Sequence, residues 1–249
     1  MVRKFQMFYA PAQENRTIHV YLPDDYDETD ERYPVLYMFD GHNMFSPEDA
    51  TYGVCWGLKE FLDSYGKKMI VVGMECSHTG HNRLSEYSPY NFHTRSVGKI
   101  AGKGDDTMQW IVNIVKPYID CTYRTWSHRE ATAIGGSSMG GLMSVYAVFR
   151  YNHIFSKAAC VSPALGFEIR SIRKMARESS LAQDTRIFFS WGSQEYKLAD
   201  IKLGGYIRDL DQIAQQKGVS TYIYRQDGGK HCEADWALQV EEWMDYLWR

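Results

Sequence analysis

Short apolar runs alternate with segments that carry apolar residues at helical spacing along most of this chain. The apolar runs have strand length and predict buried β-strands at 33–39, 68–74, 131–134, 156–161, 185–191 and 220–224. The segments between and after them predict helices at 56–65, 107–123, 142–149, 169–177, 199–216 and 233–248. Because alternating strands and helices are typical of βαβ units, we expect a mainly parallel sheet with helices on both faces.

The first 22 residues follow a different pattern. Two β-like runs, 4–10 and 17–22, are joined by the polar segment 13–16, which predicts an antiparallel hairpin at the start of the sheet. No linker or internal repeat interrupts the remaining chain, so residues 1–249 are predicted to form a single α/β domain.

Two features depart from the simple alternation of strands and helices. Pro117 lies inside the predicted helix 107–123 and is expected to kink it or to end its first half. Residues 75–105 are polar and aromatic and too long for a plain connection, and loops of this kind are often lids or substrate-binding insertions. A disordered surface insertion is the alternative for this segment.

Composition excludes several classes of partner. The chain is 44% hydrophobic, which is enough for a buried core, and its formal net charge is −3. Lysine and arginine are scattered, so no basic patch favours nucleic acid or an anionic membrane. No window reaches the roughly 18 uninterrupted apolar residues of a membrane span. We therefore expect no nucleic-acid or membrane partner, whereas a homo-oligomer remains open.

The N-terminus and the cysteines bear on the compartment. Residues 1–8 contain two basic residues but neither the apolar core nor the cleavage site of a secretory signal. The chain has an odd number of cysteines, five, and none of them shows C-x-x-C spacing. This pattern is typical of cysteines that remain reduced thiols. We therefore expect a cytoplasmic protein.

The strongest chemical signal lies in residues 131–141. Gly136-Ser137-Ser138-Met139-Gly140 fits G-x-S-x-G, the nucleophile elbow of serine hydrolases built on an α/β sheet. In this motif the serine stands at a sharp, strained turn, and small residues two positions away let the strand and helix approach. A Gly/Ser-rich turn without chemistry is the alternative. An apolar strand before the motif and an apolar helix after it provide the required context, so Ser138 is the candidate nucleophile.

A serine hydroxyl needs a histidine to accept its proton and an acid to fix the tautomer of that histidine. In α/β hydrolases the chain order is serine, acid, histidine, and only His153 and His231 follow Ser138. His153 lies at the end of the helix that follows the serine and is too close in sequence to fold back over it. His231 lies on a glycine-rich loop after the last predicted strand and is the candidate base.

The acid is expected just after the strand at 185–191. Glu195 is the first choice and Asp200 the second, because both follow this strand, whereas Asp184 precedes it. Asp227 and Asp235 flank His231, and near neighbours on one loop rarely reach the imidazole correctly.

An oxyanion hole requires two backbone N–H groups that point at the developing negative charge. The amide of Met139, directly after the nucleophile, is one candidate, and the other should come from the loop at 40–43. Gly41 permits an unusual backbone there, which leaves the His42 amide as the second donor. Metal binding by His42, His78, His81 or His93 is the competing interpretation, but H-E-x-x-H and comparable ligand spacings are absent.

The chain resembles the "putative esterase" family of α/β hydrolases, which includes enterochelin-type siderophore esterases, feruloyl and acetyl-xylan esterases, S-formylglutathione hydrolases and mycolyltransferases. The resemblance covers nearly the whole chain and is carried by YMFDGHNMF at 37–45, RLSEYSP at 83–89, GGSSMGG at 135–141, VSP at 161–163, GSQE at 192–195, and His231 with Trp236. It implies an α/β-hydrolase fold, with Ser138 as nucleophile, Glu195 as acid and His231 as base. It also implies small exposed acyl esters as substrates and no metal.

These observations predict a serine carboxylesterase that acts on a small-molecule ester through a covalent acyl-enzyme and needs no cofactor. Acetyl and feruloyl esters of sugars are candidate substrates. An acyltransferase with the same three residues is the closest alternative, because the acyl-enzyme is common to both reactions. A non-catalytic binding protein with a hydrolase fold is the alternative from another class.

Overall fold

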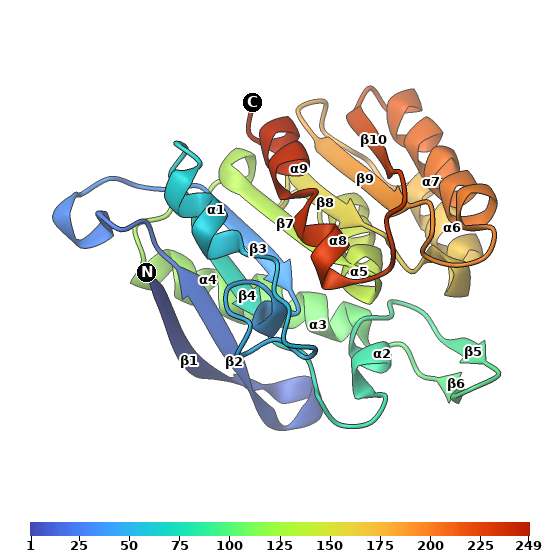
Figure 1. Ribbon diagram of the computed structural model, residues 1–249, viewed down its shortest axis with the longest axis horizontal. Coiled ribbons are helices and arrows are strands. Elements are labelled where there is room, and N and C mark those ends of the chain that lie inside the picture. Colours follow the sequence, from blue (N-terminus) through green and yellow to red (C-terminus); the bar gives the residue numbers. More distant parts are fainter.

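The computed structural model describes residues 1–249 and is built around one eight-stranded sheet (Figure 1). The strands are β1 Val2–Tyr9, β2 Glu14–Tyr21, β3 Val35–Phe39, β4 Ile70–Met74, β7 Thr132–Ser137, β8 Lys157–Val161, β9 Arg186–Gly192 and β10 Ser220–Gln226. Their order across the sheet is β1-β2-β4-β3-β7-β8-β9-β10. β2 runs antiparallel to β1 and β4, and all other pairs are parallel, so the predicted N-terminal hairpin and mainly parallel sheet are confirmed.

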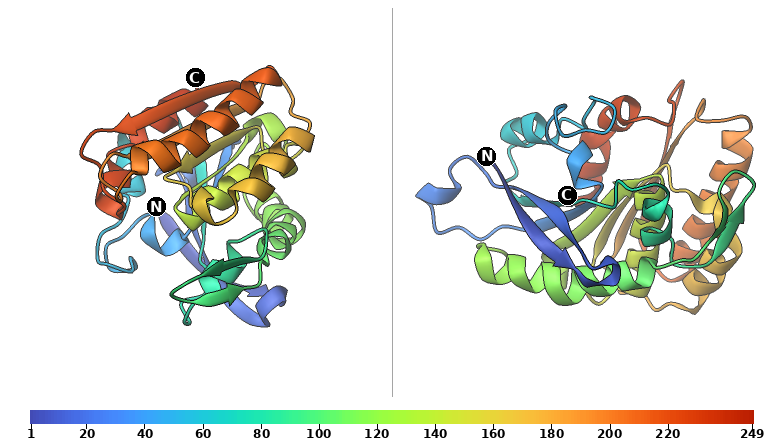
Figure 2. Two further views of the ribbon diagram at one scale, coloured as in Figure 1. Left: turned by 90° about the vertical axis from the view of Figure 1, so that its right-hand side faces the viewer. Right: turned by 90° about the horizontal axis from the view of Figure 1, so that it is seen from below.

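Helices cover both faces of the sheet (Figure 2). They are α1 Leu58–Ser64, α2 Asn82–Glu86, α3 Gly104–Trp110, α4 Lys116–Thr122, α5 Met139–Arg150, α6 Ile169–Glu178, α7 Ala199–Gln216, α8 Glu233–Ala237 and α9 Val240–Leu247. One apolar core contains side chains of α3 to α7, and a second contains those of α1, α8 and α9. This is the α/β-hydrolase arrangement.

Strand β3 shows how its sequence serves both cores. Val35, Tyr37 and Phe39 belong to the larger core, whereas Leu36 and Met38 belong to the smaller one. Successive side chains of a strand point to opposite faces, so a strand buried on both faces must be apolar at every position. Burial on both faces therefore explains why β3 is an uninterrupted apolar run in the sequence.

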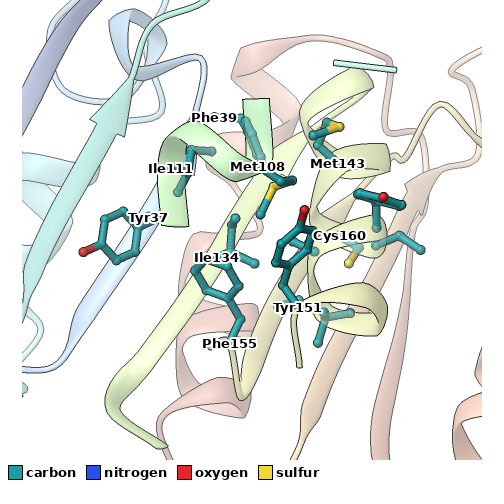
Figure 3. Packing of buried hydrophobic residues seen from close by; sticks show 14 of the residues in the cluster. Tyr37, Phe39, Met108, Ile111, Ile134, Met143, Tyr151, Phe155 and Cys160 are labelled. Atoms are coloured by element: carbon teal, nitrogen blue, oxygen red, sulfur yellow. The ribbon is translucent and has the colours of Figure 1, made fainter. Parts of the chain in front are cut away.

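The larger core packs α5 and the helix before it against the middle of the sheet (Figure 3). Phe155 lies edge-on to Tyr37, with ring centroids 6.2 Å apart, and both rings are fully buried. Burial of a large apolar side chain contributes about 1.5–3 kcal/mol relative to exposure. The core thereby fixes β7 and α5, the two elements that flank Ser138.

Two of the predicted helices are interrupted in the structure. The helix around Pro117 continues from α3 to α4 through a π-helical turn at Ile111–Val115, so Pro117 does not end the helical path. Proline has no N–H to donate to the preceding turn of an α-helix. The wider π-helical turn at Ile111–Val115 lies directly before the turn that contains Pro117. The prediction of one closing helix was wrong, because α8 and α9 are separated at Leu238 and Gln239. The buried Gln239 donates to Gln226 there at 2.6 Å.

Residues 75–105 contain regular structure rather than a plain loop. Helix α2 is followed by a two-stranded hairpin of β5 Phe92–Thr94 and β6 Gly98–Ile100, which projects from the body of the molecule (Figures 1 and 2). No helix of the structure combines the length and apolarity needed to cross a membrane.

Candidate active site

The residues selected from the sequence converge at one edge of the sheet, where the parallel strands end. His42 follows β3, Ser138 follows β7, Glu195 follows β9 and His231 follows β10. Ser162, which was not predicted, follows β8 at the same edge. In open parallel sheets, ligands bind outside the carboxyl ends of the strands.

Ser138 occupies the turn between β7 and α5 with φ of 56° and ψ of −117°. Two glycines make this turn sterically feasible. A Cβ atom on Gly136, in β7, would lie 3.0 Å from the carbonyl carbon of Gly140, in α5, and one on Gly140 would lie 2.8 Å from Phe39 Cβ. The expected close approach of strand and helix is therefore confirmed.

Backbone strain concentrates at this edge of the sheet. Asp40, Ser138 and Ser162 have φ of 58°, 56° and 45°, and they are three of the five non-glycine residues with positive φ. Such conformations cost on the order of 1–3 kcal/mol each and cluster where function requires them. Each of the three directly follows a parallel strand.

One hydrogen-bonded chain links the serine, the histidine and the acid. Ser138 Oγ lies 2.9 Å from Nε2 of His231, and Nδ1 of the same ring lies 2.9 Å from Oε2 of Glu195. The Glu195 side chain is fully shielded from solvent, whereas that of His231 is 36% exposed. The geometry is that required to pass a proton from a serine to an imidazole held by a carboxylate.

Ser162 and the end of β9 orient the Glu195 carboxylate. Its other oxygen, Oε1, accepts hydrogen bonds from Ser162 Oγ at 2.5 Å and from the Gly192 N–H at 2.6 Å. Ser162 Oγ in turn accepts from Trp236 Nε1 at 2.9 Å. Sequence reasoning gave Ser162 no role, although it lies directly after a predicted strand and within the VSP motif at 161–163.

Asp200, the alternative acid, is bonded elsewhere. Nε and Nη2 of Arg225 each lie 2.8 Å from its carboxylate, and Trp191 Nε1 donates to it at 2.8 Å. The hydrogen bonds from Arg225 and Trp191 hold the pKa of Asp200 at about 2. Asp227 also contacts Arg225, and Asp235 accepts from a backbone N–H of its own loop.

The loops that carry the acid and the histidine are joined through their backbones. The Gln194 N–H donates to the Gly229 carbonyl at 2.8 Å. A Cβ atom on Gly192 would lie 2.3 Å from that same carbonyl oxygen, so the two loops can approach only through glycine. This pairing fixes the separation of Glu195 and His231.

Met139 and His42 carry the two backbone amides that are candidates for the oxyanion hole. Met139 is the first residue of α5, and amides in a first helical turn have no carbonyl of their own helix to bond. His42 lies in a 3-10 turn, Gly41–Asn43, and lines the same cavity as Ser138. A Cβ atom on Gly41 would lie 2.3 Å from the carbonyl carbon of Gly73 in β4, so this turn is pressed directly onto the sheet.

An ion pair that the sequence did not predict holds the backbone before His42. Nε and Nη2 of Arg83, in α2, each lie 2.7 Å from an oxygen of Asp40. Burial opposes ionisation of Asp40, but the Arg83 guanidinium outweighs it and keeps the pKa of that carboxyl below its ordinary value. The two residues are 43 positions apart, and only their spatial contact reveals the pair.

Two cavities of different chemistry meet at Ser138 and His231. The first, of about 520 Å³, is largely apolar and aromatic. Its wall includes Pro163, Leu165, Phe167, Tyr196, Leu203 and Tyr206. The second, of about 400 Å³, is polar, and its lining includes Asp40, His42, Asn43, His78, Arg83 and Glu233.

The histidines considered as metal ligands do not form a metal site. The rings of His42 and His78 lie 4.6 Å apart, while His81 and His93 are exposed. No three histidine, cysteine, aspartate or glutamate side chains are arranged to hold a metal ion. Burial lowers the pKa of His42 despite the neighbouring Asp40, which favours a neutral ring.

Known proteins share this architecture. The chain is 27% identical to the Bacillus subtilis (strain 168) protein YbbA over 184 residues, which are 73% of this chain and 69% of YbbA. Among solved structures, an IroE-like serine hydrolase from Shewanella oneidensis superposes with a TM-score of 0.78 and 18% identity over 99% of this chain and 79% of that one. A ferulic acid esterase superposes with a TM-score of 0.73 and 20% identity over 99% and 97%.

The two structural likenesses concern the fold, because their sequence identity is low. A family model matches residues 10–244, almost the whole chain, and the family is described as "Putative esterase". The chain therefore belongs to this esterase family.

Proposed function

We propose that this protein is a serine carboxylesterase that hydrolyses small acyl esters through a covalent acyl-enzyme. The observation that carries the proposal is the unbroken chain from Ser138 Oγ through His231 to Glu195, with both hydrogen bonds at 2.9 Å. Membership of an esterase family supports ester hydrolysis independently of this geometry.

In the first half-reaction, Ser138 Oγ attacks the ester carbonyl carbon while its proton passes to Nε2 of His231. The charged imidazole is stabilised by the Glu195 carboxylate at Nδ1. When the tetrahedral intermediate collapses, the bond to the alcohol oxygen breaks and His231 gives its proton to that oxygen. The acyl group remains on Ser138.

In the second half-reaction, a water molecule loses a proton to His231 and attacks the acyl-enzyme. The acid is released, and the proton returns to Ser138 Oγ. The amides of Met139 and His42 hold the negative carbonyl oxygen in both tetrahedral intermediates. Backbone donors of this kind lower the barrier because they are already oriented before the charge develops.

We assign the acyl group to the apolar cavity and the alcohol to the polar cavity. The wall of the apolar cavity suits a hydrocarbon or aromatic acyl group, and the carboxylates and imidazoles of the other cavity suit a hydroxyl-rich alcohol. Acetyl and feruloyl esters of sugars fit both descriptions, and the structurally similar ferulic acid esterase is consistent with this choice.

The polar cavity also supports acyl transfer as a second candidate. Its volume of about 400 Å³ beside Ser138 could hold an acceptor alcohol in place of the attacking water. Product analysis in the presence of sugar acceptors separates the two reactions, because a transferase makes a new ester and a hydrolase releases only the acid.

Hydrolysis of p-nitrophenyl acetate and butyrate, recorded from early times, tests the proposal. We expect p-nitrophenol release with an initial burst if deacylation is the slower step. We also expect covalent labelling by a fluorophosphonate at Ser138. A protein that neither hydrolyses these esters nor reacts with the label would instead be a hydrolase-fold binding protein.

The turn that carries the His42 amide gives a separate prediction. In Gly41→Ala, the new Cβ would meet the Gly73 backbone, so the turn must shift. We expect a loss of about 1–3 kcal/mol in unfolding free energy from overpacking. A displaced oxyanion donor should lower kcat roughly 10²-fold. Urea unfolding and p-nitrophenyl acetate kinetics measure the two effects.

Gly205→Ala is the matched control for this variant. A Cβ atom there, inside α7, meets nothing within 4 Å. We expect this substitution to raise the unfolding free energy by about 0.5–1 kcal/mol, because alanine favours the helix more than glycine does. Its kcat should equal that of the wild type. Unchanged kcat in Gly41→Ala would argue against the His42 amide as an oxyanion donor.

A further inference from the structure

A buried carboxyl group lies directly behind one wall of the apolar cavity. Residues 162–167 all line the cavity, and the next residue, Glu168, is only 4% exposed. The Glu168 N–H donates to the Leu165 carbonyl at 3.1 Å, and its own carbonyl accepts from the Ile172 N–H at 3.0 Å. Glu168 therefore connects the cavity wall to the start of α6.

The Glu168 side chain reaches across to the segment before the β5–β6 hairpin. Its Oε1 is hydrogen-bonded to Ser88 Oγ, and its Oε2 accepts from the Tyr90 N–H at 3.2 Å. Ser88 Oγ lies 3.1 Å from the Tyr90 carbonyl oxygen, to which it can donate. The three residues thus form a closed ring of hydrogen bonds between two segments about 80 positions apart.

The ring is complete only when Glu168 carries a proton. The Ser88 hydroxyl has one hydrogen and faces two acceptors, the Glu168 carboxyl and the Tyr90 carbonyl. A protonated Glu168 donates to Ser88 Oγ, which leaves the serine hydrogen free for Tyr90. Burial raises the pKa of Glu168 to about 8, although the Tyr90 N–H lowers it, so the protonated form predominates at neutral pH.

Few other titratable groups lie around this ring. The Tyr90 phenol is the nearest, and its pKa is raised by burial and then by Glu168. Arg150, Glu178 and Asp105 act on the Tyr90 phenol, with Arg150 lowering and the two acids raising its pKa. The Glu168 carboxyl itself responds to burial and to the Tyr90 backbone.

Residues 88–90, which Glu168 holds, lead into the β5–β6 hairpin. The hairpin makes a second contact with the cavity wall. The Gly104 N–H at the start of α3 donates to the Ser88 carbonyl at 2.7 Å, which ties the two ends of the hairpin together. The ring of Phe92 in β5 packs on that of Phe167, with centroids 4.8 Å apart. Phe167 is itself part of the cavity lining.

We propose that Glu168 is a positioning residue that clamps the β5–β6 hairpin and the 162–167 wall into one rigid side of the acyl cavity. The ring of hydrogen bonds is complete only with the protonated acid, so the clamp loosens in alkaline solution. This inference rests on the proposed esterase function for its kinetic readout, but the clamp itself can be measured without a substrate.

The kinetic test compares p-nitrophenyl butyrate with p-nitrophenyl acetate, because the butyryl chain is two carbons longer and is expected to extend along the wall. In Glu168→Ala and in Ser88→Ala we expect KM for butyrate to rise about tenfold, the effect of one lost buried hydrogen bond. The kcat for acetate should stay close to the wild-type value, because Ser138, His231 and Glu195 are not altered and Ser162 keeps its hydrogen bond from Trp236. A merely structural role would instead lower kcat for both esters.

Glu168→Gln is the conservative variant that separates the proton from the charge. A glutamine amide donates to Ser88 Oγ and accepts from the Tyr90 N–H at any pH, as the protonated acid does. We expect wild-type KM values for this variant near pH 7. From about pH 7 to about pH 9, the ratio of KM for butyrate to KM for acetate should rise in the wild type and stay flat in Glu168→Gln.

Hydrogen–deuterium exchange gives the readout that needs no ester. We expect amides of residues 88–104 to exchange faster in Glu168→Ala and Ser88→Ala, and in the wild type at about pH 9 after correction for intrinsic rates. Equal protection in all variants, or equal KM ratios in an active enzyme, would overturn the clamp. If the wild type hydrolyses no ester but the exchange differences between variants are observed, the proposed esterase function is contradicted and the proposed clamp is supported.

Discussion

Replacement of Ser138 by alanine should abolish nearly all hydrolysis of p-nitrophenyl acetate, with kcat reduced by a factor on the order of 10⁵ to 10⁶. The hydroxyl that forms the acyl-enzyme is then absent, and no other group lies at 2.9 Å from Nε2 of His231 in its place. KM should change little, because the methyl group of the alanine still borders both cavities. Steady-state kinetics at high enzyme concentration measure the residual rate.

Ser144→Ala is the matched control, since Ser144 is a buried serine of α5 six residues further along the chain. Its Oγ donates only to the Gly140 carbonyl of the same helix, at 2.8 Å. We expect near wild-type kcat and full fluorophosphonate labelling for this variant, and no labelling for Ser138→Ala. A kcat for Ser138→Ala that is comparable to that of the wild type would contradict the proposed mechanism.

Replacement of Glu195 by glutamine should lower kcat by a factor on the order of 10³ to 10⁴. The amide is nearly isosteric, so the backbone pairing of the two loops should persist. The negative charge beside Nδ1 of His231 is lost, however, and the imidazolium that forms during attack is no longer stabilised. The rate of fluorophosphonate labelling should fall as well, since it depends on the same activated serine.

The variant Asp200→Asn tests whether Glu195 or Asp200 is the catalytic acid, a choice that the sequence left open. Asp200 binds Arg225 and Trp191 at the surface, away from the imidazole. We expect kcat of Asp200→Asn to remain within about twofold of the wild type, as for an exposed ion pair. A large loss of kcat in Asp200→Asn together with a small loss in Glu195→Gln would reverse the roles of the two acids.

Much of the candidate site could be predicted because local sequence and chain order carry it. The G-x-S-x-G motif requires the turn at Ser138 through its glycines, and the backbone there adopts φ of 56°. The order of serine, acid and histidine then selects His231 and, for the acid, Glu195 or Asp200, since all three follow a parallel strand. Parallel strands place their carboxyl ends together, so these residues had to meet at one edge.

Other features had no local signal. The hydrogen bond from Ser162 to Glu195, the ion pair of Arg83 with Asp40 and the contact of Ser88 with Glu168 join residues 33, 43 and 80 positions apart. Each depends on which loops the sheet order brings together. The residues in these contacts are polar or charged, and such residues are usually solvated at a protein surface, so their identity alone does not reveal a contact.

The amino-acid pattern alone predicts the class of fold, the position of the serine turn and the set of residues from which the acid and base are drawn. Periodicity and glycine placement are local consequences of backbone sterics and of burial, so they can be read without coordinates. Packing of the folded chain places Glu195 rather than Asp200 beside His231, introduces the π-helical turn between α3 and α4, and forms the two cavities. Those outcomes depend on burial and on hydrogen bonds between distant segments, whose free energies exist only once the chain has packed.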